Sequence, residues 1–252
     1  MNEHIIEAQD LAYSYPDGTR GISGVSFKVA PGEAVALVGE NGAGKSTLLQ
    51  HLNGCLLPAG GSVRVAGLAV TKENFSAVRR AAGMIFQNPD DQLFMPTVFD
   101  DVAFGLLNLG VAETELEARV MKALETVGAA HLRARPPYRL SQGEKRAAAI
   151  ASVLALEPDV LVMDEPTSNL DPLARRRLIR LLKTFPHTKI IATHDLDFAL
   201  EVCGRTIVMH QSSLAADGPT AEVFRKADLL ERCNLETPPS MRPCPACKLT
   251  AI

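Results

Sequence analysis

The pattern of apolar positions predicts a chain in which short buried strands alternate with helices. Runs of four to six mostly apolar residues end at polar turns, which is typical of strands covered on both faces of a sheet. We expect such strands at residues 34–38, 83–86, 160–163, 189–192 and 205–210. Apolar residues at helical spacing follow several of these runs, so the expected fold class is α/β.

A separate group of strands is expected at the N-terminal end. Runs at residues 5–13 and 25–29 are separated by Tyr15-Pro16-Asp17-Gly18, a sequence typical of a tight turn. Because such a turn joins strands that run in opposite directions, we expect an antiparallel β subdomain here. Another short strand is expected at residues 61–65.

Helical periodicity dominates the middle of the chain. It predicts helices at residues 98–109, 113–127 and 142–156, and Gly128 is the expected stop of the second. We therefore expect a helical subdomain at residues 88–158, inserted into the strand-bearing part of the chain.

Net charge and hydropathy narrow the possible partners. The formal charge is -3 with an isoelectric point near 6.1, so charge favours neither nucleic acid nor anionic lipid. Arg175-Arg176-Arg177 is expected to be a solvated helix face. The uncharged stretch 46–63 is interrupted by polar residues and proline, and residues 1–4 lack the pattern of a signal peptide. We expect a location in the cytoplasm.

The five cysteines are scattered, and an odd number in a chain without a signal argues against a disulfide framework. Cys244-Pro245-Ala246-Cys247 is the one close pair, in a proline-rich tail. A reduced, solvated thiol pair and a metal or redox site both fit this sequence.

A glycine-rich run between a predicted strand and a predicted helix carries the strongest chemical signal. Its backbone N–H groups and the positive end of the new helix suit phosphate, so the context predicts a P-loop rather than a plain helix-capping turn. Lys45 would reach the β- and γ-phosphates and Ser46 would bind Mg²⁺. The candidate ATP-binding residues of this run are Gly39, Asn41, Gly42, Ala43, Gly44, Lys45, Ser46 and Thr47.

Polar residues at the ends of three other predicted strands are further candidates. Asp164 could hold Mg²⁺, and Glu165 could orient or deprotonate the attacking water. Gln87 could contact Mg²⁺ or a water, although a turn residue also fits. His194 could donate to a γ-phosphate oxygen or to the water, against the alternative of a structural histidine.

Two weaker signals complete the set of candidates. In Leu140-Ser141-Gln142-Gly143-Glu144, Ser141 and Glu144 match a capping box, but Gly143 in the first helical turn favours an anion that approaches its N–H. Tyr15 could stack on a base or simply pack beside its turn, and both interpretations stay open.

Taken together, residues 5–224 resemble the nucleotide-binding subunit of ATP-binding-cassette (ABC) transporters. The resemblance implies a P-loop NTPase (RecA-like) core at residues 1–87 and 159–236, the helical insertion, and a tail at 237–252. It also implies the following roles: Walker A at 39–46, Q-loop at Gln87, signature at 140–144, Walker B at 160–164, catalytic carboxylate at Glu165, D-loop at 168–171, switch histidine at His194 and adenine stacking by Tyr15.

In that family a signature helix meets the nucleotide of a second subunit. The resemblance thus implies two chains arranged head to tail, with ATP between Lys45 of one and Ser141 and Gly143 of the other. The family's usual signature is Leu-Ser-Gly-Gly-Gln, and Gln142 and Glu144 depart from it here. We expect the site to work, with the additional carboxylate of Glu144 close to phosphate.

A narrower resemblance, to the ATPases of energy-coupling-factor importers of the cobalt and nickel branch, rests on residues 86–94, 96–98 and 101–105. It implies a second ATPase, an integral-membrane coupling subunit, a membrane-embedded substrate binder and a location at the cytoplasmic face of the membrane. Self-pairing is permitted because both half-sites are present. A vitamin such as biotin is the alternative cargo.

Two other functional classes fit parts of the sequence. A soluble cassette ATPase that acts on ribosomes or DNA would be expected to have tandem cassettes, a long coiled coil or a basic surface, and the sequence predicts none of these. For a P-loop kinase or a switch-type binding module, the run at 140–144 and Glu165 would be coincidental.

Overall fold

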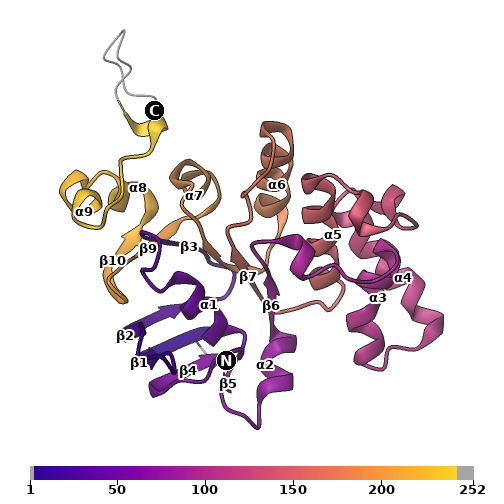
Figure 1. The fold of residues 1–252 in the computed structure, drawn as a ribbon, viewed down its shortest axis with the longest axis horizontal. Coiled ribbons are helices and arrows are strands. Elements are labelled where there is room, and N and C mark those ends of the chain that lie inside the picture. Colours follow the sequence, from indigo (N-terminus) through magenta and orange to yellow (C-terminus); the bar gives the residue numbers. More distant parts are fainter. Residues whose placement is uncertain (1–2, 243–252) are drawn as a thin grey trace.

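The computed structural model describes residues 3–242. It consists of two β-sheets and a group of helices that projects to one side (Figure 1). Cys244 and Cys247 lie outside the described residues.

The larger sheet forms the centre of the molecule and is mostly parallel. Its central strand β3 pairs in parallel with β8 and β9, and β7 joins β8 to β6; β10 is antiparallel to β9. Because the parallel strands end at the same edge, the residues that follow β3, β6, β7 and β8 are brought together there. The order across the sheet is β10 (Ser213–Pro219), β9 (Arg205–His210), β3 (Ala34–Val38), β8 (Thr188–Ala192), β7 (Val160–Asp164) and β6 (Ala82–Ile85).

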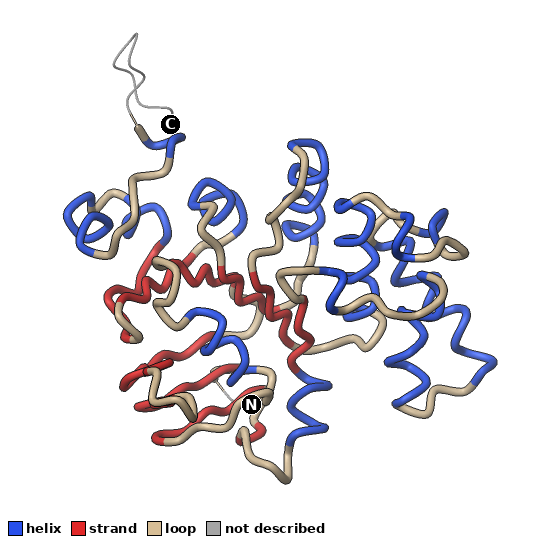
Figure 2. The backbone as a smooth tube through the Cα atoms, in the orientation of Figure 1, coloured by secondary structure: helices blue, strands red, loops and turns tan. Residues whose placement is uncertain are grey.

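The smaller sheet is antiparallel, as the N-terminal turn predicts. Helix α1 (Lys45–Leu52) packs between the two sheets, where its buried Leu48, Leu49 and Leu52 share one core with residues of both (Figure 2). The order of strands is β2 (Arg20–Val29), β1 (Ile6–Ser14), β4 (Gly60–Val65) and β5 (Leu68–Ala69).

Alternate residues of β3 face opposite layers, as a strand buried on both sides requires. Val35 and Leu37 face the core around α1, whereas Ala36 and Val38 join a second core with the C-terminal helices. Those helices cover the face of the central sheet opposite α1, above the sheet in Figure 1. They are α6 (Pro172–Thr184), α7 (Leu196–Val202), α8 (Thr220–Phe224) and α9 (Ala227–Arg232).

The chain between β6 and β7 forms the projecting helical part, which has its own core around Val102, Leu106 and Leu124. This arrangement confirms the α/β core with an inserted helical subdomain, whereas the boundaries at residues 88 and 158 stay a prediction. No helix within residues 3–242 is long and apolar enough to cross a membrane. The helices of this part are α3 (Val98–Asn108), α4 (Glu113–Thr126) and α5 (Gln142–Leu154), whereas α2 (Phe75–Ala81) precedes β6.

The strands β5 and β10 and the helix α7 were not expected from the sequence. β10 is an edge strand of half-buried and exposed residues that contains Gly218 and Pro219, so it lacks a clear alternation of apolar positions. α7 has only seven residues and depends on the cap that the Asp195 side chain provides. The strand expected at residues 25–29 begins earlier, at Arg20.

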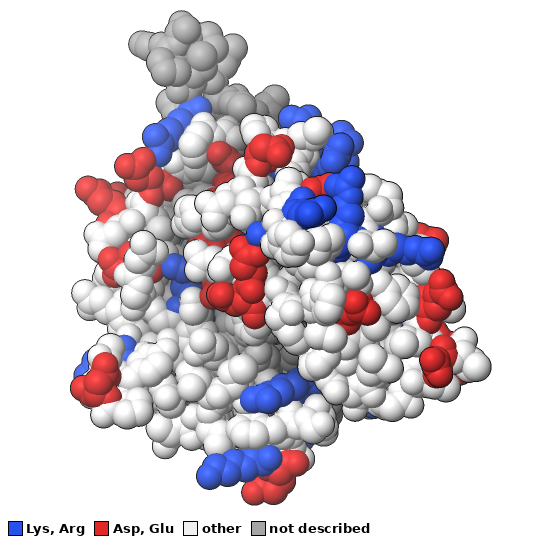
Figure 3. All heavy atoms as spheres, turned by 45° about the vertical axis from the view of Figure 1, so that its right-hand side comes forward, with Lys and Arg blue, Asp and Glu red and all other residues white. Residues whose placement is uncertain are grey.

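The basic run on α6 is only partly a solvated face. Arg176 and Arg177 are exposed, whereas Arg175 is half-buried and ion-paired. On the face drawn in Figure 3, Lys and Arg side chains form a compact group in the upper part, with acidic side chains on either side of it.

Candidate functional site

A cavity of about 550 Å³ lies at the edge where the parallel strands end. It gathers candidate residues that are far apart in the sequence, from the P-loop and from the ends of β6, β7 and β8. Its lining residues are Tyr15, Thr19, Arg20, Gly21, Asn41, Gly42, Gly44, Lys45, Ser46, Thr47, Gln87, Asp164, Glu165 and His194.

The glycine-rich loop opens directly into α1 without a side-chain cap. Gly44 occupies the N-cap position in a left-handed conformation with φ of 99°, and a Cβ there would lie 2.4 Å from the carbonyl oxygen of Gly21. Only glycine fits this position. Since no side chain caps the first N–H groups of α1, they are available to a phosphate.

Lys45 begins α1 and is buried. Its Nζ donates to the carbonyl oxygens of Gly39 at 2.7 Å and Glu40 at 3.0 Å, so it holds the loop in shape. Burial lowers the pKa of Lys45, and the nearby carboxylates of Glu165 and Asp164 counteract this. A triphosphate would supply the opposing charge that a buried ammonium group favours.

Ser46 and Asp164 provide a donor set that fits Mg²⁺. Burial raises the pKa of Asp164, a hydrogen bond with Ser46 lowers it, and the adjacent Glu165 raises it further. Hydroxyl, carboxylate and amide oxygens suit this ion, and Gln87 lines the same cavity. Within residues 3–242 no cluster of three or more His, Cys, Asp or Glu could hold a metal by itself.

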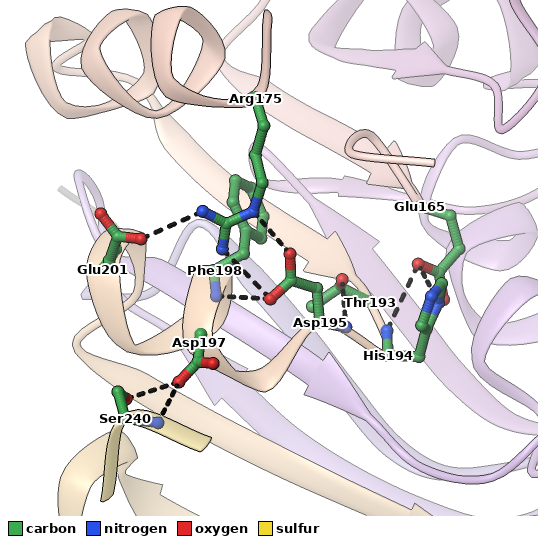
Figure 4. Close-up of polar contacts among 9 residues, drawn as sticks. All are labelled: Glu165, Arg175, Thr193, His194, Asp195, Asp197, Phe198, Glu201 and Ser240. Atoms are coloured by element: carbon green, nitrogen blue, oxygen red, sulfur yellow. Dashed lines mark hydrogen bonds and ion pairs between the residues drawn. The ribbon is translucent and has the colours of Figure 1, made fainter. Parts of the chain in front are cut away.

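Glu165 and His194 both line the cavity, and their side chains contact each other (Figure 4). Oε2 of Glu165 lies 2.8 Å from Nδ1 of His194 and accepts from the His194 backbone N–H at 3.3 Å. Glu165 is buried and left-handed, with φ of 46°. A non-glycine residue in this conformation costs on the order of 1–3 kcal/mol and is typical of functional sites.

Tyr15 lines the cavity from the turn after β1, and its hydroxyl lies 2.9 Å from Oγ1 of Thr47. Its ring meets Tyr13 edge to face, at 5.2 Å between centroids. Packing and ligand contact are therefore compatible, and base stacking stays a prediction. Thr19 and Arg20 also line the cavity, although nothing in their local sequence distinguishes them from ordinary strand residues.

Four predicted ATP-binding residues do not line this cavity. Gly39 and Ala43 belong to the loop that borders the cavity. The Gly39 carbonyl oxygen accepts from Lys45 Nζ, and Ala43 is buried. Ser141 and Gly143 line a different, larger cavity of about 840 Å³ between α5 and α6. The P-loop and the signature run of one chain therefore do not form a single site.

The capping box predicted at the start of α5 is present. Oε2 of Glu144 accepts from the N–H and the hydroxyl of Ser141, both at 2.8 Å, while the Glu144 N–H donates to Ser141 Oγ. These bonds lower the pKa of Glu144, which also faces Arg135 at 3.8 Å. The carboxylate thus stays ionised, with Arg135 as a nearby opposite charge, and the proton of the Ser141 hydroxyl points toward it.

Gly143 has a structural reason that the sequence did not reveal. A Cβ at Gly143 would lie 2.9 Å from the Cβ of Ala174 in α6, closer than two carbons can pack. From the sequence, an approaching anion was the only reason for a glycine at this position. Close contact between α5 and α6 supplies a second requirement.

Gly143→Ala is expected to lower the free energy of unfolding by about 1 kcal/mol. Overpacking costs about 1–3 kcal/mol, and the better helix propensity of alanine returns about 0.5–1 kcal/mol. Thermal and urea unfolding of the purified chain measure this difference.

The matched control is the double variant Gly143→Ala, Ala174→Gly, which moves the methyl group across the contact. It should recover part of the lost stability, and a double variant no more stable than Gly143→Ala would contradict the packing argument.

Arg146 is a site residue that the sequence analysis left without a role. It is buried on α5, and its Nη1 and Nη2 donate to the carbonyl oxygens of Phe86 and Gln87 at 2.5 and 2.6 Å. Burial lowers its pKa to about 10. Lys145 pairs with Asp90 at 2.6 Å, so the loop after β6 is fastened to α5. The signal in the sequence was an arginine on the otherwise apolar face of this helix.

Comparison with known proteins gives consistent results. Residues 22–168 match the family described as ABC transporter. A putative ABC transporter ATP-binding protein of Geobacter sulfurreducens is 58% identical over 247 residues, covering 98% of this chain and 99% of that protein. The energy-coupling factor transporter ATP-binding protein EcfA of Methanothermobacter thermautotrophicus is 46% identical over 239 residues, covering 93% and 77%.

A solved structure of similar fold is that of CbiO1 from Clostridium perfringens, described as part of the ABC transporter complex CbiONQ. It superposes with a TM-score of 0.82 at 37% identity, covering 92% of this chain and 95% of that one.

Proposed function

This chain belongs to the ABC transporter family and is an ATPase, and we propose that it energises an energy-coupling-factor importer, with cobalt or nickel ions as the cargo. The observation that carries the proposal is the separation of the two half-sites. Lys45 and Glu165 line one cavity, while Ser141 and Gly143 line another. A complete ATP site therefore needs a second subunit.

In the proposed assembly, ATP lies between the P-loop of one chain and the signature run of the other. Lys45 and the α1 N-terminus bind the phosphates, and Ser46, Gln87 and Asp164 hold Mg²⁺. When bound, Mg²⁺ neutralises the charge that develops on the phosphoryl group. ATP binding closes the pair, and phosphate release removes the contact that keeps it closed.

Glu165 acts as the base in this proposal. Both of its contacts with His194 use Oε2, so Oε1 is the oxygen expected to accept the proton of the attacking water. His194 orients the carboxylate through Nδ1, and in its imidazolium form, with both ring nitrogens protonated, it also donates from Nε2 to the γ-phosphate. In this proposal Tyr15 stacks on the adenine, and Thr47, whose Oγ1 lies 2.9 Å from the Tyr15 hydroxyl, also contacts the nucleotide.

An exposed apolar patch supports an integral-membrane partner. Phe94, Phe104 and Leu107 are exposed by 65%, 39% and 53%, and the two rings meet edge to face at 5.0 Å. Clustered exposed aromatic residues mark interaction surfaces. The patch follows the loop that Arg146 holds, so a coupling subunit bound there would contact the Gln87 loop and α5 together.

The cargo assignment rests on the resemblance of residues 86–105 to the cobalt and nickel branch, and the name of the EcfA relative supports the importer class. Accumulation of cobalt, nickel and biotin in cells that express the complete importer tests it. Metal accumulation that requires intact Glu165 is the expected result. ATP-dependent accumulation of biotin without metal would overturn the cargo, and recovery of the chain without any membrane protein would overturn the importer.

Phe94→Ser is expected to lower recovery of membrane subunits with the tagged chain at least about tenfold, because a buried aromatic anchor is worth about 2 kcal/mol or more. Affinity purification from detergent-solubilised membranes measures this. ATP turnover by the isolated variant is the internal control and should match the unaltered chain. Native recovery would place the partner on another surface.

A further inference from the structure

Arg175 departs from the solvated helix face that its sequence context predicts. Its Nε and Nη2 bind the two carboxylate oxygens of Asp195 at 2.8 and 3.2 Å, and its Nη1 lies 3.2 Å from Oε1 of Glu201 (Figure 4). A two-point arginine–carboxylate contact fixes both distance and orientation. This pair joins α6 to the loop that precedes α7.

Asp195 is held from several sides. Its Oδ1 accepts from the Phe198 N–H at 2.8 Å as the cap of α7, and its own N–H donates to Oγ1 of the buried Thr193 at 3.0 Å. Although burial opposes it, the hydrogen bonds from Arg175 and Phe198 keep the pKa of Asp195 below its ordinary value. The carboxylate therefore stays charged and available to Arg175.

His194 stands between these two anchored residues and has little packing of its own. Its side chain is 68% exposed, yet its Nδ1 and its backbone N–H both meet Oε2 of Glu165. On one side Thr193 is fixed to β3, because its N–H donates to the Leu37 carbonyl oxygen at 3.1 Å. On the other side the fixed point is the Asp195 carboxylate. The orientation of His194 thus depends on the Arg175–Asp195 pair.

We propose that Arg175 is a positioning residue for ATP hydrolysis, which acts through Asp195 and His194 on the Glu165 carboxylate. The proposal rests on the roles proposed above for Glu165 and His194. It adds a consequence for the dimer, because Ala174, the neighbour of Arg175 on α6, is the residue that Gly143 contacts. The helix that touches the signature run of one half-site thereby also sets the catalytic pair of the other half-site in the same chain.

A plain tether between α6 and α7 is the competing explanation, and kinetics separate the two. Arg175→Met keeps the aliphatic stem and removes the guanidinium. We expect kcat per subunit to fall about 10- to 100-fold, as a misplacement of about 1 Å can produce, while KM for ATP changes less than about twofold. Turnover is measured at protein concentrations where the rate per subunit no longer rises.

Three further variants define the contact. Glu201→Gln removes the negative charge of the outer partner of Arg175 and should leave kcat unchanged. Arg175→Lys keeps the charge but not the two-point contact and should give an intermediate rate. Asp195→Asn retains an oxygen that can cap α7, so it should lower kcat at a nearly native melting temperature. Asp195→Asn also tests the same ion pair if Arg175→Met does not fold.

A double-mutant cycle tests whether Arg175 acts through Glu165. In a Glu165→Gln background, Arg175→Met should change the residual rate less than about twofold, because the group that it positions is already absent. An equal fall in both backgrounds, or native kcat in both Arg175→Met and Asp195→Asn, would overturn the proposal. Because the purified chain alone is assayed, the result does not depend on the cargo or on the membrane partner.

Discussion

Glu165→Gln is expected to give a chain that binds ATP and dimerises but turns it over at least about 100-fold more slowly. Loss of a positioned general base costs about 10²–10⁴ in rate. Glutamine keeps an oxygen that can accept from His194, so the cavity should retain its shape. Phosphate release measures turnover, and light scattering with ATP measures the dimer. In the unaltered chain, hydrolysis continually removes the ATP-bound dimer. In the variant this dimer should accumulate.

Glu157→Gln is a matched control for this variant. Glu157 is also a left-handed glutamate, with φ of 51°, but it lies on the surface and pairs with Lys122 outside the nucleotide cavity. Its turnover should be unaltered. Near-native turnover by Glu165→Gln would refute the assignment of Glu165 as the base, and a variant that stays monomeric with ATP would refute closure around the nucleotide.

Lys45→Ala is expected to weaken ATP binding about 10- to 100-fold and to abolish measurable turnover. Hydrogen bonds to charged groups contribute about 1.5–3 kcal/mol, and Lys45 is the buried cation of the loop. Titration with a fluorescent ATP analogue gives the affinity. Lys72→Ala, at an exposed lysine outside the cavity, is the control and should bind normally.

The same variant also tests the loop without a nucleotide. Since Lys45 donates to the carbonyl oxygens of Gly39 and Glu40, its loss should lower the melting temperature of the ligand-free chain by a few degrees. Undiminished affinity in a folded variant would mean that the phosphates bind elsewhere.

The central strands and the loop between β3 and α1 were predictable because each depends on local sequence. Ala34–Val38 is apolar throughout, and the glycines that follow it leave few other conformations for the chain. The proximity of Asp164, Glu165 and His194 was predictable for a second reason. These residues follow β7 and β8, and parallel strands end at one edge of the sheet.

Contacts between distant segments were not predictable. Nothing local indicates that Gly143 faces Ala174, that Arg175 binds Asp195, or that Arg146 reaches the carbonyl oxygen of Gln87. The contacts of Gly143 and Arg146 are decided by how the helical part packs on the core, and that of Arg175 by how α6 and α7 pack beside each other. A run of three arginines looks uniformly solvated until the fold shows that one of them points inward.

The hydrogen bonds from Arg146 to the Phe86 and Gln87 carbonyl oxygens have a consequence for the coupling of ATP hydrolysis to transport in the proposed importer. The loop proposed to contact the coupling subunit and the helix that begins at the signature run share one buried guanidinium, so neither can move far without the other. Hydrolysis of ATP without movement of the coupling subunit would require the contact between Arg146 and these carbonyl oxygens to break. The coupling of ATP hydrolysis to transport would then depend on how rigidly the Arg146 side chain is held rather than on the chemistry of the nucleotide.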